Sequence, residues 1–220
     1  MPPITVMVKP VSGACNMRCR YCFYADEMKR RNTSLHPPMD DQTMRSAVRR
    51  CMAYADEQIT FVFQGGEPAL AGADYYRRFI HLVREYNARK LSVHYAFQTN
   101  GYDLSDDMIA LLAQEHFLVG VSLDGTEWIH NQFRTDASNC GTYAQVRQTI
   151  GRLDQAGVSY NILCVITSAA AQQAEEVLDA LSAFPYLQFI PCMDELDGRI
   201  GSYSLTNEGY AHFLKHAFLR

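Results

Sequence analysis

Three cysteines near the start of the chain have the type and spacing of a metal-centre ligand set. Cys15, Cys19 and Cys22 stand in the run CNMRCRYC, with the spacing C-x3-C-x2-C. A [4Fe–4S] cluster usually takes one cysteine thiolate on each iron. Three neighbouring cysteines therefore leave one iron without a protein ligand, and that iron can bind a small molecule.

Other interpretations of the three cysteines fit the sequence less well. A zinc site normally needs four ligands, and no histidine or second C-x2-C pair lies close by to complete one. A disulfide framework is disfavoured because seven cysteines in 220 residues are an odd and sparse set. Zinc, or three unrelated cysteines, remains open as an alternative at this point.

Composition limits the class of protein. The chain has 220 residues, of which 48% are apolar, enough for one large domain or two small ones. A net charge of −4 gives no basic surface for nucleic acid. We expect no membrane span, because no run of about 18 apolar residues exists. Residues 1–10 do not read as a signal peptide, and free thiols favour a reducing cytoplasm.

The chain alternates predicted strands and helices. The strands are expected at residues 4–9, 59–63, 91–97, 117–121, 160–166 and 187–190. The helices are expected at 40–56, 73–87, 142–156 and 170–182, with others opening at Ser105 and Thr206. Alternation of this kind predicts an α/β fold, a parallel sheet with outer helices. Six units are too few for a closed eight-stranded barrel, so a partial (βα)6 TIM-type barrel or a doubly wound sheet is expected.

Polar or glycine-rich stretches follow the predicted strands, where parallel α/β folds bind ligands. Besides the cysteine loop, they are residues 64–68 (QGGEP), 98–101 (QTNG), 122–125 (SLDG) and 191–193 (PCM). Each stretch alone is an ordinary turn signal. Their number at one edge of the sheet, beside a candidate metal site, predicts a ligand site there.

The chemistry of this edge suits an amino acid. Paired glycines at 65 and 66 let a backbone approach a ligand closely. Glu67 can accept hydrogen bonds from an ammonium group, and Arg134 can hold a carboxylate in a bidentate fork. Ser122 adds a hydroxyl. Two alternatives stay open: Glu67 as a carboxylate at a helix N-terminus, and Arg134 in a surface ion pair.

Two further groups are ambiguous. Cys51 and Cys164 fall in apolar patterns and are expected in the core. Cys192 lies at the ligand-binding edge and is a candidate for a functional contact, and His130 is either a structural hydrogen-bonding group or functional.

The cysteine run followed by Phe23, together with Gly65-Gly66-Glu67-Pro68, resembles the radical S-adenosylmethionine (radical SAM) superfamily. The resemblance implies a partial (βα)6 barrel that holds a [4Fe–4S] cluster. It also implies that the methionine part of SAM binds the open iron. Reductive cleavage of SAM there would make a 5′-deoxyadenosyl radical, which takes a hydrogen atom from the substrate.

Within this superfamily, essentially all 220 residues are similar to anaerobic sulfatase-maturating enzymes, which oxidise a sulfatase Cys or Ser to formylglycine. The likeness extends over the motifs given above and the runs SLDG…IHN, NILCV and LQFI. The family implies a peptide substrate and an electron donor such as flavodoxin or ferredoxin.

The resemblance also implies a role for each site residue. Cys15, Cys19 and Cys22 would bind the cluster. Gly66 and Glu67 would meet the SAM amino group, with Ser122 and Arg134 at its ribose and carboxylate side and Met193 near adenine. Tyr24 and Gln64 would be the catalytic residues facing the peptide, and Tyr24 would also touch the cofactor.

One departure from the family bears on function. Its members continue into a Cys-rich SPASM domain that carries two auxiliary clusters and the proposed acid/base aspartate. We therefore expect residues 1–220 to be a radical SAM core domain, a fragment of a longer chain. The alternatives are a radical SAM maturase of another peptide, such as a thioether-forming enzyme, and a cluster-binding module without catalysis.

Overall fold

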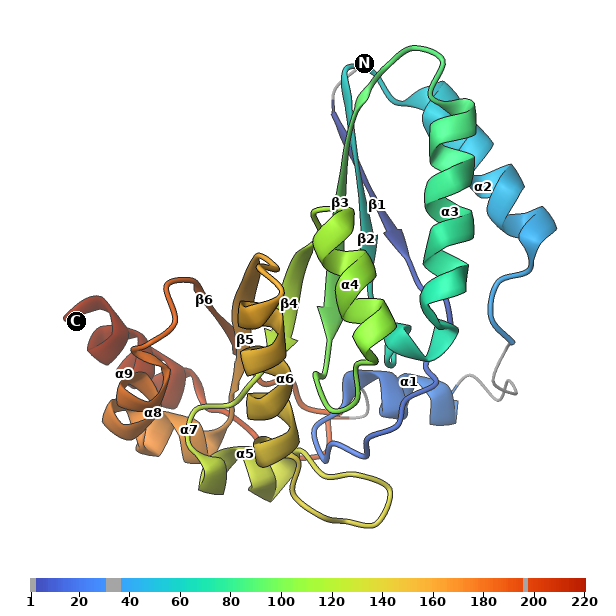
Figure 1. The fold of residues 1–220 in the computed structure, drawn as a ribbon. Coiled ribbons are helices and arrows are strands. Elements are labelled where there is room, and N and C mark those ends of the chain that lie inside the picture. The colour runs from blue at the N-terminus through green and yellow to red at the C-terminus, as the bar shows by residue number, and fades with distance from the viewer. Residues whose placement is uncertain (1–2, 31–36, 196–197) are drawn as a thin grey trace.

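A computed structural model describes residues 3–30, 37–195 and 198–220. It contains one sheet of six parallel strands whose order in space is their order in the chain. These strands are β1 (Ile4–Val8), β2 (Gln58–Phe63), β3 (Ser92–Thr99), β4 (Leu118–Ser122), β5 (Tyr160–Ile166) and β6 (Leu187–Pro191). The sheet curls into a half-barrel (Figure 1). The predicted partial barrel is confirmed, and the doubly wound alternative is wrong, because the strand order never reverses.

The helices follow the strands. They are α1 (Phe23–Arg30), α2 (Asp41–Tyr54), α3 (Ala73–Tyr86), α4 (Asp106–Gln114), α5 (Glu127–Phe133), α6 (Tyr143–Gln155), α7 (Ser168–Gln172), α8 (Ala174–Leu181) and α9 (Asn207–Phe218), with a 3-10 turn η1 (Pro68–Ala71). The predicted starts are confirmed, since the side chains of Asp40, Ser105 and Thr206 cap α2, α4 and α9. The helix predicted at 170–182 is two helices that meet at Gln173.

The hydrophobic core lies between the sheet and its outer helices. Every second residue of β2 is buried, and Phe61 and Phe63 each pack edge-on against Phe79 of α3 with ring centroids 5.0 Å apart. Cys164 is also buried there, and Cys51 packs against the core from α2. Figure 1 shows α2, α3, α4 and α6 on this convex side of the sheet. These contacts fix the strands, and so the positions of the loops at their carboxyl ends.

The alternate strand residues point into the half-barrel and stay more exposed. Met7 of β1 is 54% exposed and Leu118 of β4 is 52% exposed, although both lie within strands. The inside of the sheet is thus an open concave face that leads to the carboxyl ends of the strands.

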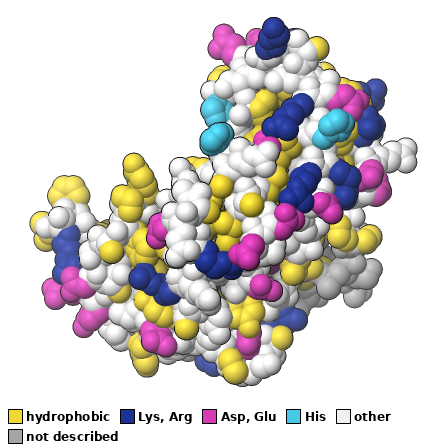
Figure 2. All heavy atoms as spheres, viewed as in Figure 1, with side chains coloured by type: hydrophobic (Ala, Val, Ile, Leu, Met, Phe, Trp, Pro, Cys, Tyr) yellow, Lys and Arg dark blue, Asp and Glu magenta, His cyan; other side chains and the backbone are white. Residues whose placement is uncertain are grey.

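The outer surface of α3 carries paired charges. Arg77 contacts Asp74 and Asp107, and Arg78 contacts Asp41. Figure 2 shows the same pattern more widely, with Lys and Arg side chains lying among Asp and Glu side chains on this face. In the described ranges, no helix is long and apolar enough to span a bilayer.

Candidate active site

The cysteine loop, residues 15–22, is held along the segment that follows α5. The backbone N–H of Arg18 donates to Thr135 O at 2.7 Å, and that of Arg20 donates to Phe133 O at 2.9 Å. Met17 and Asp136 form an antiparallel bridge beside them. A loop without regular structure of its own is therefore fixed by hydrogen bonds to residues more than one hundred positions later.

The glycine pair holds the other side of this loop. The N–H of Gly66 donates to Ser12 O at 2.9 Å, and the N–H of Glu67 donates to Ala14 O at 2.8 Å. A Cβ on Gly66 would lie 2.0 Å from Ala14 O, which no real atom tolerates. The close approach predicted for these glycines is therefore made first of all to the backbone before Cys15.

A cavity of about 260 Å³ opens at the carboxyl ends of the strands. The three cysteines line it, together with every other predicted site residue except Glu67: Tyr24, Gln64, Gly66, Ser122, Arg134 and Met193. Cys192, placed at this edge from the sequence, also lines the cavity. The predicted convergence of the strand-end motifs on one space is thus observed.

Glu67 lies outside the lining of the cavity. It is 1% exposed, and its carboxylate accepts from Thr99 Oγ1 at 3.0 Å, Asn100 N at 2.7 Å and Ala69 N at 3.0 Å. Burial raises its pKa to about 7, against the opposing effect of these donors. The carboxylate therefore fixes the turn after β3 and caps η1, which combines the open helix-terminus interpretation with a second role the sequence did not indicate.

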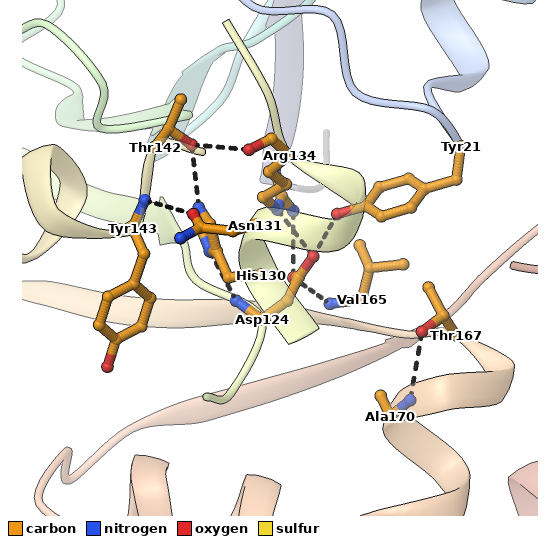
Figure 3. A network of polar contacts seen from close by, with 10 residues as sticks. All are labelled: Tyr21, Asp124, His130, Asn131, Arg134, Thr142, Tyr143, Val165, Thr167 and Ala170. Carbon is orange, nitrogen blue, oxygen red and sulfur yellow. Dashed lines mark hydrogen bonds and ion pairs between the residues drawn. The ribbon is translucent and has the colours of Figure 1, made fainter. Parts of the chain in front are cut away.

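Arg134 makes a buried ion pair rather than a surface one. It is 6% exposed, and its Nε and Nη2 donate to Asp124 Oδ2 and Oδ1 at 2.8 and 3.3 Å (Figure 3). Asp124 also accepts from the Tyr21 hydroxyl and, at 2.9 Å, from Val165 N. Burial alone would raise the pKa of Asp124, but the Arg134 charge holds it below its usual value. The predicted fork of Arg134 thus grips a protein carboxylate.

His130 supports the same network. Its Nδ1 accepts from Asp124 N at 3.3 Å, and its Nε2 lies 3.0 Å from Thr142 Oγ1, which itself donates to Arg134 O at 3.1 Å (Figure 3). Because the single hydroxyl proton of Thr142 is used on Arg134, Nε2 carries the imidazole proton. Burial lowers the pKa of His130 to about 4. Of the two open interpretations, the structural hydrogen-bonding role is the one observed.

Tyr24 and Gln64 meet across the cavity. Tyr24 is in the first turn of α1, directly after Cys22, and Gln64 follows β2. The Gln64 amide Nε2 donates to the Tyr24 hydroxyl at 2.9 Å, and Lys9 Nζ lies 4.8 Å from the centre of the Tyr24 ring. The pair forms a polar wall beside the cysteines. Met193 lies on the opposite side of the opening and is 61% exposed.

The donor set of the cavity fits an iron–sulfur cluster. Thiolates are the ligands that such clusters take, one for each iron, so the thiols need only surround a shared space. Cys15, Cys19 and Cys22 do so, each partly buried. Burial raises the pKa of Cys19 to about 12, while the Arg134 charge lowers it. In the described part of the chain, no three His, Cys, Asp or Glu side chains are arranged to hold a single metal ion.

Comparison with known proteins identifies the family. A family model described as the radical SAM superfamily matches residues 10–181. The chain belongs to the radical SAM superfamily. Its cofactors are the [4Fe–4S] cluster and SAM, and in this radical SAM chain the cysteine loop and the surrounding cavity are the residues that would hold both.

The radical SAM chain is similar to enzymes of both sulfatase types. It is 37% identical over 222 residues to a cysteine-type anaerobic sulfatase-maturating enzyme of Clostridium novyi (strain NT), covering 99% of this chain and 59% of the relative. It is 31% identical over 217 residues to a serine-type enzyme of Klebsiella aerogenes, covering 96% of this chain and 52% of the relative. The chain thus spans little more than half the length of these relatives.

A solved structure agrees with the sequence comparison. Native anSMEcpe with bound AdoMet and the Kp18Cys peptide superposes on this radical SAM chain with a TM-score of 0.92 at 35% identity. The match covers 99% of this chain and 59% of that chain.

Sequence reasoning missed three residues of the site. Tyr21 stood inside the cysteine motif, Asn100 in the stretch after β3 and Asp124 in the stretch after β4, but none was given a role. Their positions on the same edge were the available signal. Their partners lie far away in the chain, so only the fold shows what they bind.

Proposed function

We propose that this chain is a radical SAM oxidoreductase that oxidises an active-site Cys or Ser of a sulfatase to formylglycine. The observation that carries the proposal is the shared cavity, where the three cysteines lie beside the Tyr24–Gln64 pair. The likeness over nearly the whole chain to anSMEcpe with bound AdoMet and peptide supports it.

We propose that SAM lies against the strand-end loops. Gly66 offers backbone at the cavity wall, and Ser122 offers a hydroxyl at the end of β4. The Arg134 guanidinium carries more N–H donors than its bonds to Asp124 use, so it can still meet a carboxylate. Met193 would cover the adenine. The predicted contact of Glu67 with the SAM amino group stays a prediction, and we propose that Glu67 acts chiefly by holding Thr99 and Asn100.

The reaction must remove electrons from the substrate carbon. Oxidising the side-chain CH2 of Ser or Cys to an aldehyde or thioaldehyde removes two electrons and two protons, and water then converts a thioaldehyde to the aldehyde. Bound SAM and cluster would supply a one-electron abstraction of hydrogen, and a one-electron acceptor would take the second electron. The protein positions the substrate CH2 and excludes water.

Tyr24 and Gln64 are the proposed catalytic residues. Both line the cavity, and the hydrogen bond between them fixes the Tyr24 hydroxyl toward Gln64. Peptide backbone offers the N–H and C=O groups that an amide and a phenol can bind. We propose that this pair holds the peptide so that its target CH2 faces the cofactors.

The proposed partners are a sulfatase segment and an electron donor such as flavodoxin or ferredoxin. The proposed location is the cytoplasm. All seven cysteines are free of disulfides in the structure, and an iron–sulfur cluster needs reduced thiolates.

A direct test uses anaerobically reconstituted protein with SAM, a chemical reductant and a sulfatase peptide that contains the target Cys or Ser. We expect 5′-deoxyadenosine by chromatography and formylglycine in the peptide by mass spectrometry. Gln64→Ala and Tyr24→Phe are expected to lower the formylglycine yield about 10-fold or more, because the reacting carbon loses its position. Tyr86→Phe, on the far surface of α3, is the matched control and is expected to leave the yield unchanged.

The outcomes separate the readings. Deoxyadenosine without formylglycine would favour a radical SAM maturase of another peptide. A fully loaded cluster that yields no deoxyadenosine would contradict radical SAM catalysis and favour a cluster-binding module.

A further inference from the structure

Cys15 differs from an ordinary loop cysteine in the hydrogen bonds that its sulfur receives. The backbone N–H of Met17 points at Cys15 Sγ at 3.4 Å, as expected within a tight loop. A second donor comes from outside the loop, because the side-chain Nδ2 of Asn100 lies 3.6 Å from the same sulfur. Asn100 follows β3, 85 positions further along the chain.

The orientation of the Asn100 amide is set by its other partners. Its Oδ1 accepts from Tyr102 N at 2.9 Å, so the oxygen must face away from the cysteine loop. Its Nδ2 also donates to Asn16 Oδ1 at 2.9 Å. A flipped amide would lose both of these bonds, so the N–H groups face Cys15 and Asn16.

The backbone of Asn100 is fixed as firmly as its amide. Its N–H donates to the buried Glu67 carboxylate at 2.7 Å, and the neighbouring Thr99 hydroxyl donates to the same carboxylate at 3.0 Å. Asn100 itself is 8% exposed and lines the cavity. The N–H that points at Cys15 is therefore presented from a rigid support in a space with little water.

We propose that Asn100 is a positioning residue that raises the reduction potential of the cluster through its N–H bond to Cys15. A reduced cluster carries more negative charge on its sulfurs, and an N–H dipole aimed at a sulfur stabilises that charge. Hydrogen bonds to sulfur are among the established determinants of cluster potential, and outer residues of this kind tune metal sites. The inference rests on Cys15 being a cluster ligand, as the proposed function requires.

The test measures the potential of the reconstituted cluster by redox titration followed by electron paramagnetic resonance. Asn100→Leu removes the N–H at similar volume, and Asn100→Asp removes it while keeping an acceptor for Tyr102 N. We expect both variants to load iron and to titrate at a more negative potential, with the larger shift in Asn100→Asp because of its added charge. A potential equal to that of the wild type in both variants would overturn the proposal.

Thr99→Val is the matched control. It removes a hydroxyl bond to Glu67 from the same turn but leaves the Asn100 amide facing the sulfur, so we expect an unshifted potential. An equal shift in Thr99→Val would mean that distortion of the turn is responsible, and the proposal would fail.

A spectroscopic test needs no variant. Wild-type protein labelled with 15N-asparagine should show a weak nitrogen coupling to the reduced cluster in pulsed electron paramagnetic resonance, and its absence would contradict the bond. These readouts are independent of substrate. A shifted potential with no formylglycine would therefore support the role of Asn100 while contradicting sulfatase maturation.

Discussion

The Tyr21 hydroxyl donates a hydrogen bond to the Asp124 carboxylate, although the two residues are 103 positions apart. Tyr21 lies between two of the three cysteines, and Asp124 follows β4. The same carboxylate takes both bonds from Arg134, which also lies 5.4 Å from the Tyr21 ring centroid. One buried acid thus joins the cysteine loop to the sheet and to the end of α5 (Figure 3).

Removing this acid is expected to destabilise the fold strongly. Asp124→Ala leaves Arg134 buried without its partner, which costs about 3–5 kcal/mol in comparable cases. Tyr21→Phe removes only one donor and should cost about 1–3 kcal/mol. Chemical denaturation of the two variants measures the difference. Glu85→Gln, which breaks the exposed contact with Arg45, is the control and should unfold near the wild-type midpoint; an Asp124→Ala protein as stable as that control would contradict the network.

The cluster ligands are expected to behave as a set. Cys15→Ala, Cys19→Ala and Cys22→Ala should each lose most of the iron and the visible absorbance that the wild type acquires on anaerobic reconstitution, about four irons per chain. Cys140→Ala, at an exposed site, should retain them. Iron analysis and absorbance decide the matter. Full iron content in any of the three variants would remove that cysteine from the ligand set.

Gly66 should tolerate no side chain. A Cβ there meets the carbonyl of Ala14 at 2.0 Å, and backbone on both sides leaves little room to relax. We expect Gly66→Ala to lower both the melting temperature and the cluster content. The control is Gly151→Ala in α6, where no atom lies within 4 Å of the added carbon. That change should stabilise the helix by about 0.5–1 kcal/mol, and similar behaviour of the two variants would argue against the close approach.

His130 predicts a pH dependence of stability. Its pKa falls from 6.5 in the unfolded chain to about 4 in the fold, because it is buried as the neutral form. Between these values the unfolded chain binds the proton that the folded chain refuses, so stability is complete above pH 6.5 and is lost as the pH falls toward 4. The loss attributable to this group is about 3 kcal/mol.

Unfolding free energies measured from pH 7 to pH 4 test this dependence. His130→Gln should flatten the slope, whereas His81→Gln, at an exposed position of α3, should not. An unchanged slope in His130→Gln would assign the acid sensitivity to other groups.

Local chemistry was enough to predict most of the fold. Helix starts at Asp40, Ser105 and Thr206 were found because the capping residue and the apolar stripe lie in one short window. Helix α5 was missed because its seven residues are too short for a periodic stripe. The single-domain assignment of residues 1–220 stays a prediction.

The site was predictable as a place but not as a set of contacts. Motifs at strand ends must share one edge of a parallel sheet, so the common cavity followed from topology. The partners of Arg134 and Glu67 did not, because each side chain binds a residue brought near only by folding. The same limit hid the role of Asn100.

The order of the strands has a consequence for how the protein is made. Each new strand joins the edge left by the previous one, so the sheet can grow in step with synthesis from the ribosome. The cysteines belong to the first 22 residues to emerge, yet Thr135, Arg134 and Val165, which complete the supports of their loop, come more than one hundred residues later. The iron ligands are therefore present long before their pocket exists, and assembly factors must deliver the cluster to a chain already translated through β5.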